Sequence, residues 1–245
     1  MHSPSRSNLA LSIKRFVHVT LALCALSDGV SGRAEQTPRP EKTSTASTNA
    51  SLGAKPSAAA STNTGTWQSL FDGKTLKGWA VTDFAGRGDV RVENGKLILD
   101  MGVMTGVTWT SDIPKMNYEV TLDAMRVEGS DFFCGLTFPV GKDPCSFIVG
   151  GWGGGTIGLS SLDGADAANN ETTKYLNFEN GKWFAIRLRV TPGKIEAWID
   201  EEKMVDVETA DRKIDIRIEV EQSKPFGIAS WATKAALRNI RIRRL

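Results

Sequence analysis

Histidine is the residue whose scarcity says most about this chain. The only two, His2 and His18, lie near the N-terminus, so residues 19–245 contain none. A domain formed by those residues has no imidazole, which excludes a Ser-His-Asp or Cys-His nucleophile and a His-ligated catalytic zinc. Any chemistry must therefore use carboxylates, Lys, Arg, Tyr or a metal ion held by oxygen ligands.

The chain also lacks an apolar run long enough to cross a bilayer with ease. Residues 16–26 form an apolar stretch of the length found in signal peptides, and three basic residues precede it, Arg6, Lys14 and Arg15. We therefore predict that residues 1–34 are a signal peptide and that no transmembrane span remains once it is removed.

Small residues place the predicted cleavage after Gly32 or Ala34. The mature protein is then expected to be secreted or to lie in the periplasm or cell envelope. Lipid anchoring at Cys24 is the disfavoured alternative, because Leu23 is bulky where a lipoprotein signal needs a small residue.

Residues 35–65 contain no aromatic side chain and are rich in Ser, Thr, Ala and Pro. Such a segment cannot bury enough apolar surface to offset its chain entropy, so we predict a disordered linker. The folded part is then 66–245, one domain with a faintly acidic balance. That balance argues against nucleic acid as a partner, because nucleic-acid-binding domains are usually strongly basic.

Cysteine is scarce too, and only Cys134 and Cys145 lie in the predicted domain. Residues 138–144 between them are rich in turn formers and could fold back on themselves. In an exported domain this favours a disulfide between the two cysteines. The alternative is a pair of buried free thiols, because the sequence cannot supply the required Cα distance.

No segment shows a convincing helical stripe, whereas period-two alternation recurs along the domain. In residues 90–99, Asn94-Gly95 favours a type I′ hairpin that pairs Val92 with Leu97. Similar alternation predicts a hairpin over 186–199 and strands over 118–124, 214–221 and 240–242. Half-buried strands with short turns predict an all-β fold, a two-sheet antiparallel sandwich of the jelly-roll type.

Several pieces occur in an order and spacing that resemble a known family. They are Phe71-Asp72-Gly73-Lys74-Thr75-Leu76-Lys77-Gly78-Trp79, Val92-Glu93-Asn94-Gly95-Lys96-Leu97, Tyr118-Glu119-Val120, Asn180-Gly181-Lys182-Trp183, Ile195-Glu196-Ala197-Trp198-Ile199-Asp200 and Leu237-Arg238-Asn239-Ile240-Arg241-Ile242. Together they resemble the 3-keto-disaccharide hydrolase domain family, formerly domain of unknown function 1080. The resemblance implies a concanavalin-like jelly roll, export to the envelope, and action on modified disaccharides or glycosides.

The chain departs from the family pattern at two polar positions. Many members carry a Tyr-Glu-Val-Gln-type strand, whereas residues 145–152 here contain no acid. Many also carry an Asp-His-Gly turn before the last strand, and here that stretch reads Ile228-Ala229-Ser230-Trp231. Trp231 therefore replaces a polar turn near the expected cleft.

The most unusual local feature is the glycine-rich run 150–155, which carries Trp152 between Gly151 and Gly153. Glycines let a backbone approach a ligand closely, and the indole offers a flat surface for a sugar ring. The run therefore favours a substrate-binding site. A strand crossing that packs tightly against neighbouring chains is the structural alternative.

Residues 163–171 form an oxygen-rich loop that we predict to line the same cleft, together with Trp231. Asp163 and Asp166 are its candidate catalytic carboxylates, and its candidate substrate-binding residues are Asn169, Asn170 and Glu171. No metal site is predicted, although calcium is a minor alternative at this loop because calcium takes several oxygen ligands. No other cofactor is expected.

Glu219 and Glu221 share one face of the strand predicted over 214–221, with Arg217 beside them. Glycoside hydrolysis usually needs two carboxyl groups that flank the scissile bond. Residues that point the same way do not readily do so, which favours a charged solvent face here.

Three functions remain open from the sequence. The resemblance favours an exported enzyme that hydrolyses or eliminates 3-keto-disaccharides or glycosides. Elimination needs one general base, because a 3-ketone acidifies the adjacent C–H. The polar departures favour a glycan-binding module without turnover, and the linker alone favours a structural envelope domain. The first two predict a carbohydrate or glycoside as the partner.

Overall fold

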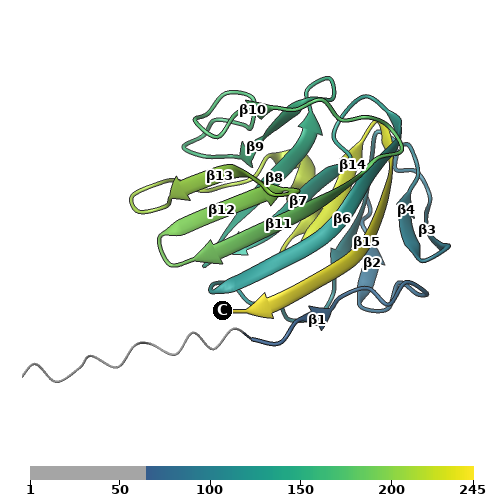
Figure 1. Ribbon diagram of the computed structural model, residues 1–245, viewed down its shortest axis with the longest axis horizontal. Helices are drawn as coiled ribbons and strands as arrows, with labels where there is room; N and C mark the ends of the chain where they lie inside the picture. Colours follow the sequence, from purple (N-terminus) through teal and green to yellow (C-terminus); the bar gives the residue numbers. More distant parts are fainter. Residues whose placement is uncertain (1–64) are drawn as a thin grey trace, which may run out of the picture. The chain divides into compact units, whose positions relative to one another are not determined.

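The structure of the protein, a computed structural model, describes residues 65–245 (Figure 1). The predicted signal peptide at 1–34, the lipid-anchor alternative at Cys24 and residues 35–64 of the predicted linker lie outside the described residues.

Residues 65–245 form fifteen β-strands and one short 3-10 helix, η1. The strands are β1 (Gln68–Ser69), β2 (Trp79–Val81), β3 (Val90–Glu93), β4 (Lys96–Leu99), β5 (Met104–Trp109), β6 (Tyr118–Gly129), β7 (Cys134–Val140), β8 (Asp143–Gly151), β9 (Thr156–Ser160), β10 (Lys174–Tyr175), β11 (Trp183–Thr191), β12 (Lys194–Ile199), β13 (Glu202–Glu208), β14 (Gly227–Trp231) and β15 (Thr233–Arg244). η1 spans Ile218–Ser223. Within this part of the chain no helix has the length and apolar character needed to cross a membrane.

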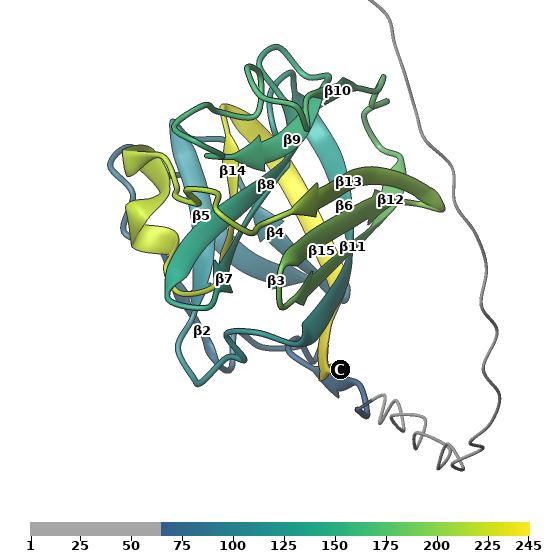
Figure 2. The ribbon, with the colours of Figure 1, turned by 90° about the vertical axis from the view of Figure 1, so that its left-hand side faces the viewer.

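The strands form two antiparallel sheets that pack face to face (Figures 1 and 2). The first sheet has the order β13-β12-β11-β6-β15-β4-β3, with β1 paired to β15. The second has the order β10-β9-β8-β7-β14-β5-β2. The architecture confirms the predicted two-sheet antiparallel sandwich.

Both predicted hairpins form in the predicted register. Val92 pairs with Leu97, and the turn residues Asn94 and Gly95 adopt φ of 50° and 76°, as a type I′ turn requires. In the β11–β12 hairpin, Arg187 pairs with Trp198, and its guanidinium lies 3.7 Å from the centroid of the indole. This cation–π contact shields part of the indole of Trp198 from solvent.

The core lies between the two sheets and follows from alternation along each strand. In β8, Cys145, Phe147 and Val149 point inward and are fully buried, while Ser146 and Ile148 lie on the opposite face. Burying a side chain such as Phe147 contributes on the order of 1.5–3 kcal/mol to stability. The second sheet therefore presents an outer face that is free to carry other elements.

The predicted disulfide is wrong, because Cys134 and Cys145 are both buried free thiols. The β7–β8 hairpin pairs Cys134 with Val149 and Phe138 with Cys145. The two cysteines are therefore offset by four residues along the ladder, about 13 Å at strand rise, well beyond bridging distance. Burial raises the pKa of each thiol to about 12.

The strand predicted over 214–221 is also wrong. Ile214 makes a single bridge to Leu162, and the chain then turns into η1. Ile216 and Val220 are buried against the outer face of the second sheet, while Ile218 is 84% exposed. Ile216 and Val220 are four residues apart, and this spacing also occurs on one face of a strand. The apolar pattern therefore resembled that of an alternating strand.

Candidate functional site

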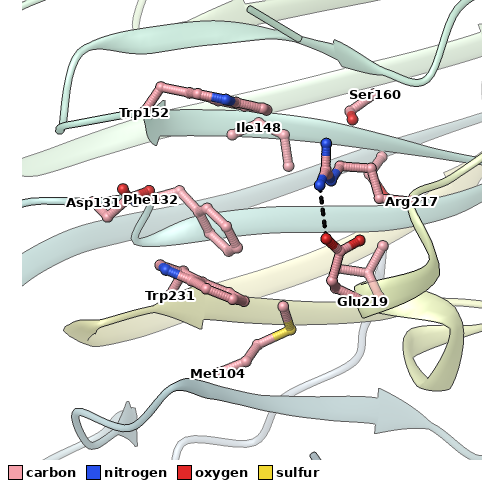
Figure 3. A pocket seen from close by; sticks show the side chains of 11 residues that line it. Met104, Asp131, Phe132, Ile148, Trp152, Ser160, Arg217, Glu219 and Trp231 are labelled. Atoms are coloured by element: carbon pink, nitrogen blue, oxygen red, sulfur yellow. Dashed lines mark hydrogen bonds and ion pairs between the residues drawn. The ribbon is translucent and has the colours of Figure 1, made fainter. Parts of the chain in front are cut away.

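A pocket of about 240 Å³ lies on the outer face of the second sheet, beside η1 (Figure 3). Its residues come from several strands and from the turn between β8 and β9. Its apolar lining is Met104, Phe132, Ile148, Trp152, Val220 and Trp231. Its polar lining is Asp131, Ser146, Ser160, Arg217 and Glu219. A concave apolar surface with a few convergent polar groups is the usual form of a small-ligand site.

Alternation along the strands places these side chains. Phe147 of β8 and Ile228 of β14 point into the core, so Ile148 and Trp231, which alternate with them in sequence, face outward. The backbone N–H of Trp231 donates to the carbonyl of Phe132 at 3.0 Å, which holds these two aromatic residues side by side. Phe132, Trp152 and Trp231 form an aromatic wall of the pocket. Trp231 belongs to β14, whereas Phe132 and Trp152 lie in the connections next to β7 and β8.

A small second hydrophobic cluster holds η1 over this face. It contains Phe84, Met104, Ile216, Val220 and Ala229, with Phe132 and Trp231 packed against it. Figure 2 shows η1 on the side of the second sheet that faces away from the first sheet. This packing brings Arg217 and Glu219 to the edge of the pocket.

The glycine-rich run forms the tight turn that carries Trp152. The Gly154 N–H donates to the Gly151 carbonyl at 3.1 Å, and Trp152 adopts a positive φ of 47°. Its indole is 45% exposed and lines the pocket. A Cβ on Gly151 would lie only 2.9 Å from Ile148, so that glycine permits close packing. The run is therefore a tightly packed turn that carries Trp152 into the pocket lining, and its role in binding a substrate stays a prediction.

Asp131 supports the same turn from the pocket side. Its carboxylate accepts hydrogen bonds from the backbone N–H groups of Phe132 at 2.7 Å and of Gly153 at 3.3 Å. Both oxygens of this pocket carboxylate are therefore engaged by backbone. Gly153, a predicted substrate-binding residue, does not line the pocket. Its N–H holds the Asp131 carboxylate instead.

Arg217 links the pocket to the 163–171 loop. One terminal nitrogen lies 2.7 Å from Glu219 Oε1, and the other lies 3.1 Å from Asp166 Oδ2 (Figure 3 shows the first contact). The hydrogen bond from Arg217 lowers the pKa of Glu219, and Glu219 in turn raises the pKa of Arg217. Glu219 is therefore an ionised carboxylate at neutral pH.

The 163–171 loop itself does not line the pocket, which corrects the prediction of one shared cleft. Its polar atoms hold the loop together instead. Asp163 accepts from the Lys213 N–H at 2.8 Å and from Arg212 at 2.6 Å, and these two contacts lower its pKa in that order. Glu171 binds Arg212 through both oxygens, at 2.7 and 2.9 Å, and Arg212 lowers the pKa of Glu171.

The two asparagines of the loop also have structural contacts. Asn170 donates to the carbonyls of Leu159, Ala165 and Asp166 and accepts from Thr172. Asn169 donates to Asp166 Oδ1 at 2.7 Å. The amide of Asn170 is therefore already satisfied without a ligand. Asp166 alone connects the loop to the pocket, through Arg217.

Calcium at this loop stays the minor alternative that the sequence left open. Arg212 and Arg217 occupy positions beside the loop carboxylates that a cation would need. Within residues 65–245 no group of three or more Cys, Asp or Glu side chains is arranged to hold a metal ion.

The sequence predicted Trp152 and Trp231 as site residues but not most of the polar residues that line the pocket. Asp131 and Ser160 carry no recognisable motif, and Glu219 was expected on a solvent face. The signal that could have found Glu219 is its spacing from Arg217, because an Arg-x-Glu pair can form an ion pair outside a strand.

A sequence model of the 3-keto-alpha-glucoside-1,2-lyase-like domain matches residues 66–243. The chain belongs to this family. The match covers nearly all of the described sandwich and confirms the resemblance drawn from its sequence motifs. The domain is therefore a carbohydrate-active β-sandwich. No curated protein matches the sequence.

Solved structures with similar folds come from proteins of low sequence identity. The Crh5 transglycosylase in complex with NAG has a TM-score of 0.50 and 12% identity, over 74% of this chain and 86% of that one. A candidate glycosyl hydrolase from Parabacteroides distasonis has a TM-score of 0.47 and 17% identity, over 73% and 94%. Carbohydrate binding module CBM66 from Bacillus subtilis has a TM-score of 0.46 and 13% identity, over 66% and 93%. At these identities the likeness concerns the fold alone.

Proposed function

We propose that the domain binds a glycoside in the pocket beside η1 and cleaves it, with 3-keto-α-glucosides as the substrate class. The observation that carries the proposal is the division of the pocket into the aromatic wall and a charged end, which is formed by Arg217 and Glu219 (Figure 3). The family to which the chain belongs supports the choice of substrate. The leader supports a site of action outside the cytoplasm, in the envelope or medium.

The aromatic wall suits a sugar ring. Trp152 and Trp231 present flat apolar surfaces, and a pyranose has an apolar face of C–H groups that stacks on such rings. The pocket has room for about eight water volumes, the scale of one sugar ring with part of a neighbour. Cleavage at or near the end of a short glycoside fits this size.

Glu219 is the group best placed to act as the base. In a 3-keto-glycoside the ketone acidifies the C2–H bond. Glu219 takes that proton, the C–H electron pair forms the C1=C2 double bond, and the C1–O bond breaks. The departing oxygen keeps the bonding pair and takes up a proton. This elimination needs one base that is ionised at neutral pH, which the ion pair with Arg217 provides.

A glycan-binding module without turnover is the second candidate, and one observation favours it. Both carboxylates that line the pocket already have partners, Asp131 in two backbone N–H groups and Glu219 in Arg217. A site whose acids are engaged can hold a sugar without transferring its protons.

One experiment separates the two candidates. The full protein is incubated with methyl 3-keto-α-glucoside, and the release of methanol and of the unsaturated sugar is followed by NMR. Binding is measured in parallel by calorimetry with Glu219→Gln. Turnover by the wild type, with binding but no turnover by the variant, supports the lyase. Binding without turnover by both proteins establishes the module, and the absence of binding contradicts both proposals.

A further inference from the structure

Ser160, at the end of β9, carries a hydroxyl that nothing in the described part of the chain satisfies. The residue is 1% exposed, and its Oγ is buried without a hydrogen-bond partner. It nevertheless lies in the wall of the pocket. An unpaired buried hydroxyl costs stability and calls for an explanation, and in the wall of a pocket a ligand that pairs with it is one.

The neighbouring serine shows what a purely structural hydroxyl does on this face. Ser146 of β8 pairs with Ser160 across the sheet and also lines the pocket. Its Oγ lies 2.9 Å from Thr137 Oγ1, so it is satisfied within the protein. The same sheet can therefore pair a serine hydroxyl, and it leaves that of Ser160 unpaired.

Ser160 shares its end of the pocket with Arg217 and Glu219 (Figure 3). Arg217 uses one N–H of each terminal nitrogen on Asp166 and Glu219, and a guanidinium has five N–H donors and no acceptor. This end therefore offers free donors from Arg217 and the O–H of Ser160. A ketone oxygen only accepts hydrogen bonds, so it can take both kinds of donor at once.

We propose that Ser160 is a specificity-determining residue that donates a hydrogen bond to the carbonyl oxygen of an oxidised sugar. The inference rests on the proposed function and adds the means by which the pocket distinguishes a keto-glycoside from its parent. Arg217 is the second donor to the same oxygen. Elimination turns that oxygen into an enolate, so donors aimed at it also stabilise the charge that develops. Glu219, paired to Arg217, is thereby held on the side of the adjacent C–H.

The test compares two probes, methyl 3-keto-α-glucoside and methyl α-glucoside, with full-length protein. A Glu219→Gln background keeps the keto probe intact during calorimetry. The wild-type serine should favour the keto probe. Ser160→Ala should lower the keto-to-parent ratio of affinities roughly 3- to 10-fold, the scale of one hydrogen bond between neutral groups. Its melting temperature without ligand should stay equal or rise, because the substitution removes an unsatisfied buried hydroxyl.

Ser223 provides the matched control. It is also fully buried with an unpaired Oγ, and it lies outside the pocket. Ser223→Ala should affect the melting temperature in the same direction and leave the ratio of affinities unchanged. A wild-type preference that survives in Ser160→Ala overturns the inference and leaves the proposed function standing. Equal binding of both probes by the protein with the native Ser160 also overturns the inference and leaves the proposed function standing. Binding of neither probe overturns the proposed function together with the inference.

Discussion

Asp166 and Glu219 are held by one guanidinium, that of Arg217, at 3.1 and 2.7 Å. The first belongs to the 163–171 loop and the second lines the pocket. Asp166, a candidate catalytic carboxylate in the sequence, therefore contacts the pocket through Arg217. In the proposed function Asp166 positions Arg217 and Glu219 is the base.

This relationship predicts different outcomes for two aspartates of one loop. Asp166→Asn should lower kcat about 5- to 10-fold, the scale of a weakened, partly exposed charge-assisted hydrogen bond, because Arg217 loses one anchor. Asp163→Asn should leave kcat unchanged and lower the melting temperature, because within residues 65–245 the Asp163 carboxylate makes its hydrogen bonds to Arg212 and Lys213, outside the pocket. Steady-state kinetics of both variants checks this, and equal losses of kcat would contradict it.

The same ion pair predicts the pH dependence of turnover. Glu219 must be ionised to act as a base, and Arg217 lowers its pKa. The acid limb of the kcat profile should therefore lie below the ordinary Glu pKa of about 4.3. Arg217→Gln should move that limb to higher pH, since the stabilised carboxylate form is lost.

The control for this profile is Glu221→Gln, which alters a neighbouring carboxylate of η1 that does not line the pocket. Its acid limb should coincide with that of the wild type. A limb that stays in place in Arg217→Gln would remove Glu219 from the role of base.

Trp152→Ala should weaken glycoside binding by about 1–3 kcal/mol, the scale of losing an aromatic anchor. The melting temperature should change little, because the indole is 45% exposed. Tyr175→Ala is the control, since this aromatic is 73% exposed and lies away from the pocket. Calorimetry and thermal melting measure both effects. A large loss of stability, or unchanged affinity, would show that Trp152 serves packing alone.

Cys134 and Cys145 should both be free and unreactive in the folded protein. Burial raises each pKa to about 12, so the reactive thiolate is scarce at neutral pH. Alkylation should be slow in native buffer and complete in denaturant without reductant. Peptide mapping by mass spectrometry distinguishes this result from a Cys134–Cys145 linked peptide, which would be incompatible with the β7–β8 register.

Local signals in the sequence were sufficient for the hairpins. Asn94-Gly95 forms a turn, and counting residues outward from it in both directions gives the strand pairing. The turn between Thr191 and Lys194 places Arg187 opposite Trp198 in the same way. The prediction of a strand over 214–221 was wrong because Ile216 and Val220 pack on the outer face of a sheet without pairing with its strands. Alternation alone does not distinguish a covering segment from a strand.

The site was predictable only where a residue type is unusual in itself. Trp152 among glycines and Trp231 in place of a polar turn were identified, and both line the pocket. Asp131, Ser160 and Glu219 became neighbours through sheet order and through the packing of η1, which one sequence does not reveal. The prediction that the 163–171 loop lines the cleft was wrong. The carboxylates and amides of this loop bind arginine side chains and the loop backbone instead.

The central claim is that a sugar binds between the aromatic wall and the charged end of this pocket. The most direct test follows the seven indole N–H signals in a nitrogen–proton NMR spectrum during titration with methyl 3-keto-α-glucoside. Assignment uses single Trp→Phe variants. We predict that the signals of Trp152 and Trp231 shift and that those of Trp183 and Trp198, which stack with arginines, stay in place. Shifts confined to Trp183 and Trp198, or no shift of any indole, would contradict it.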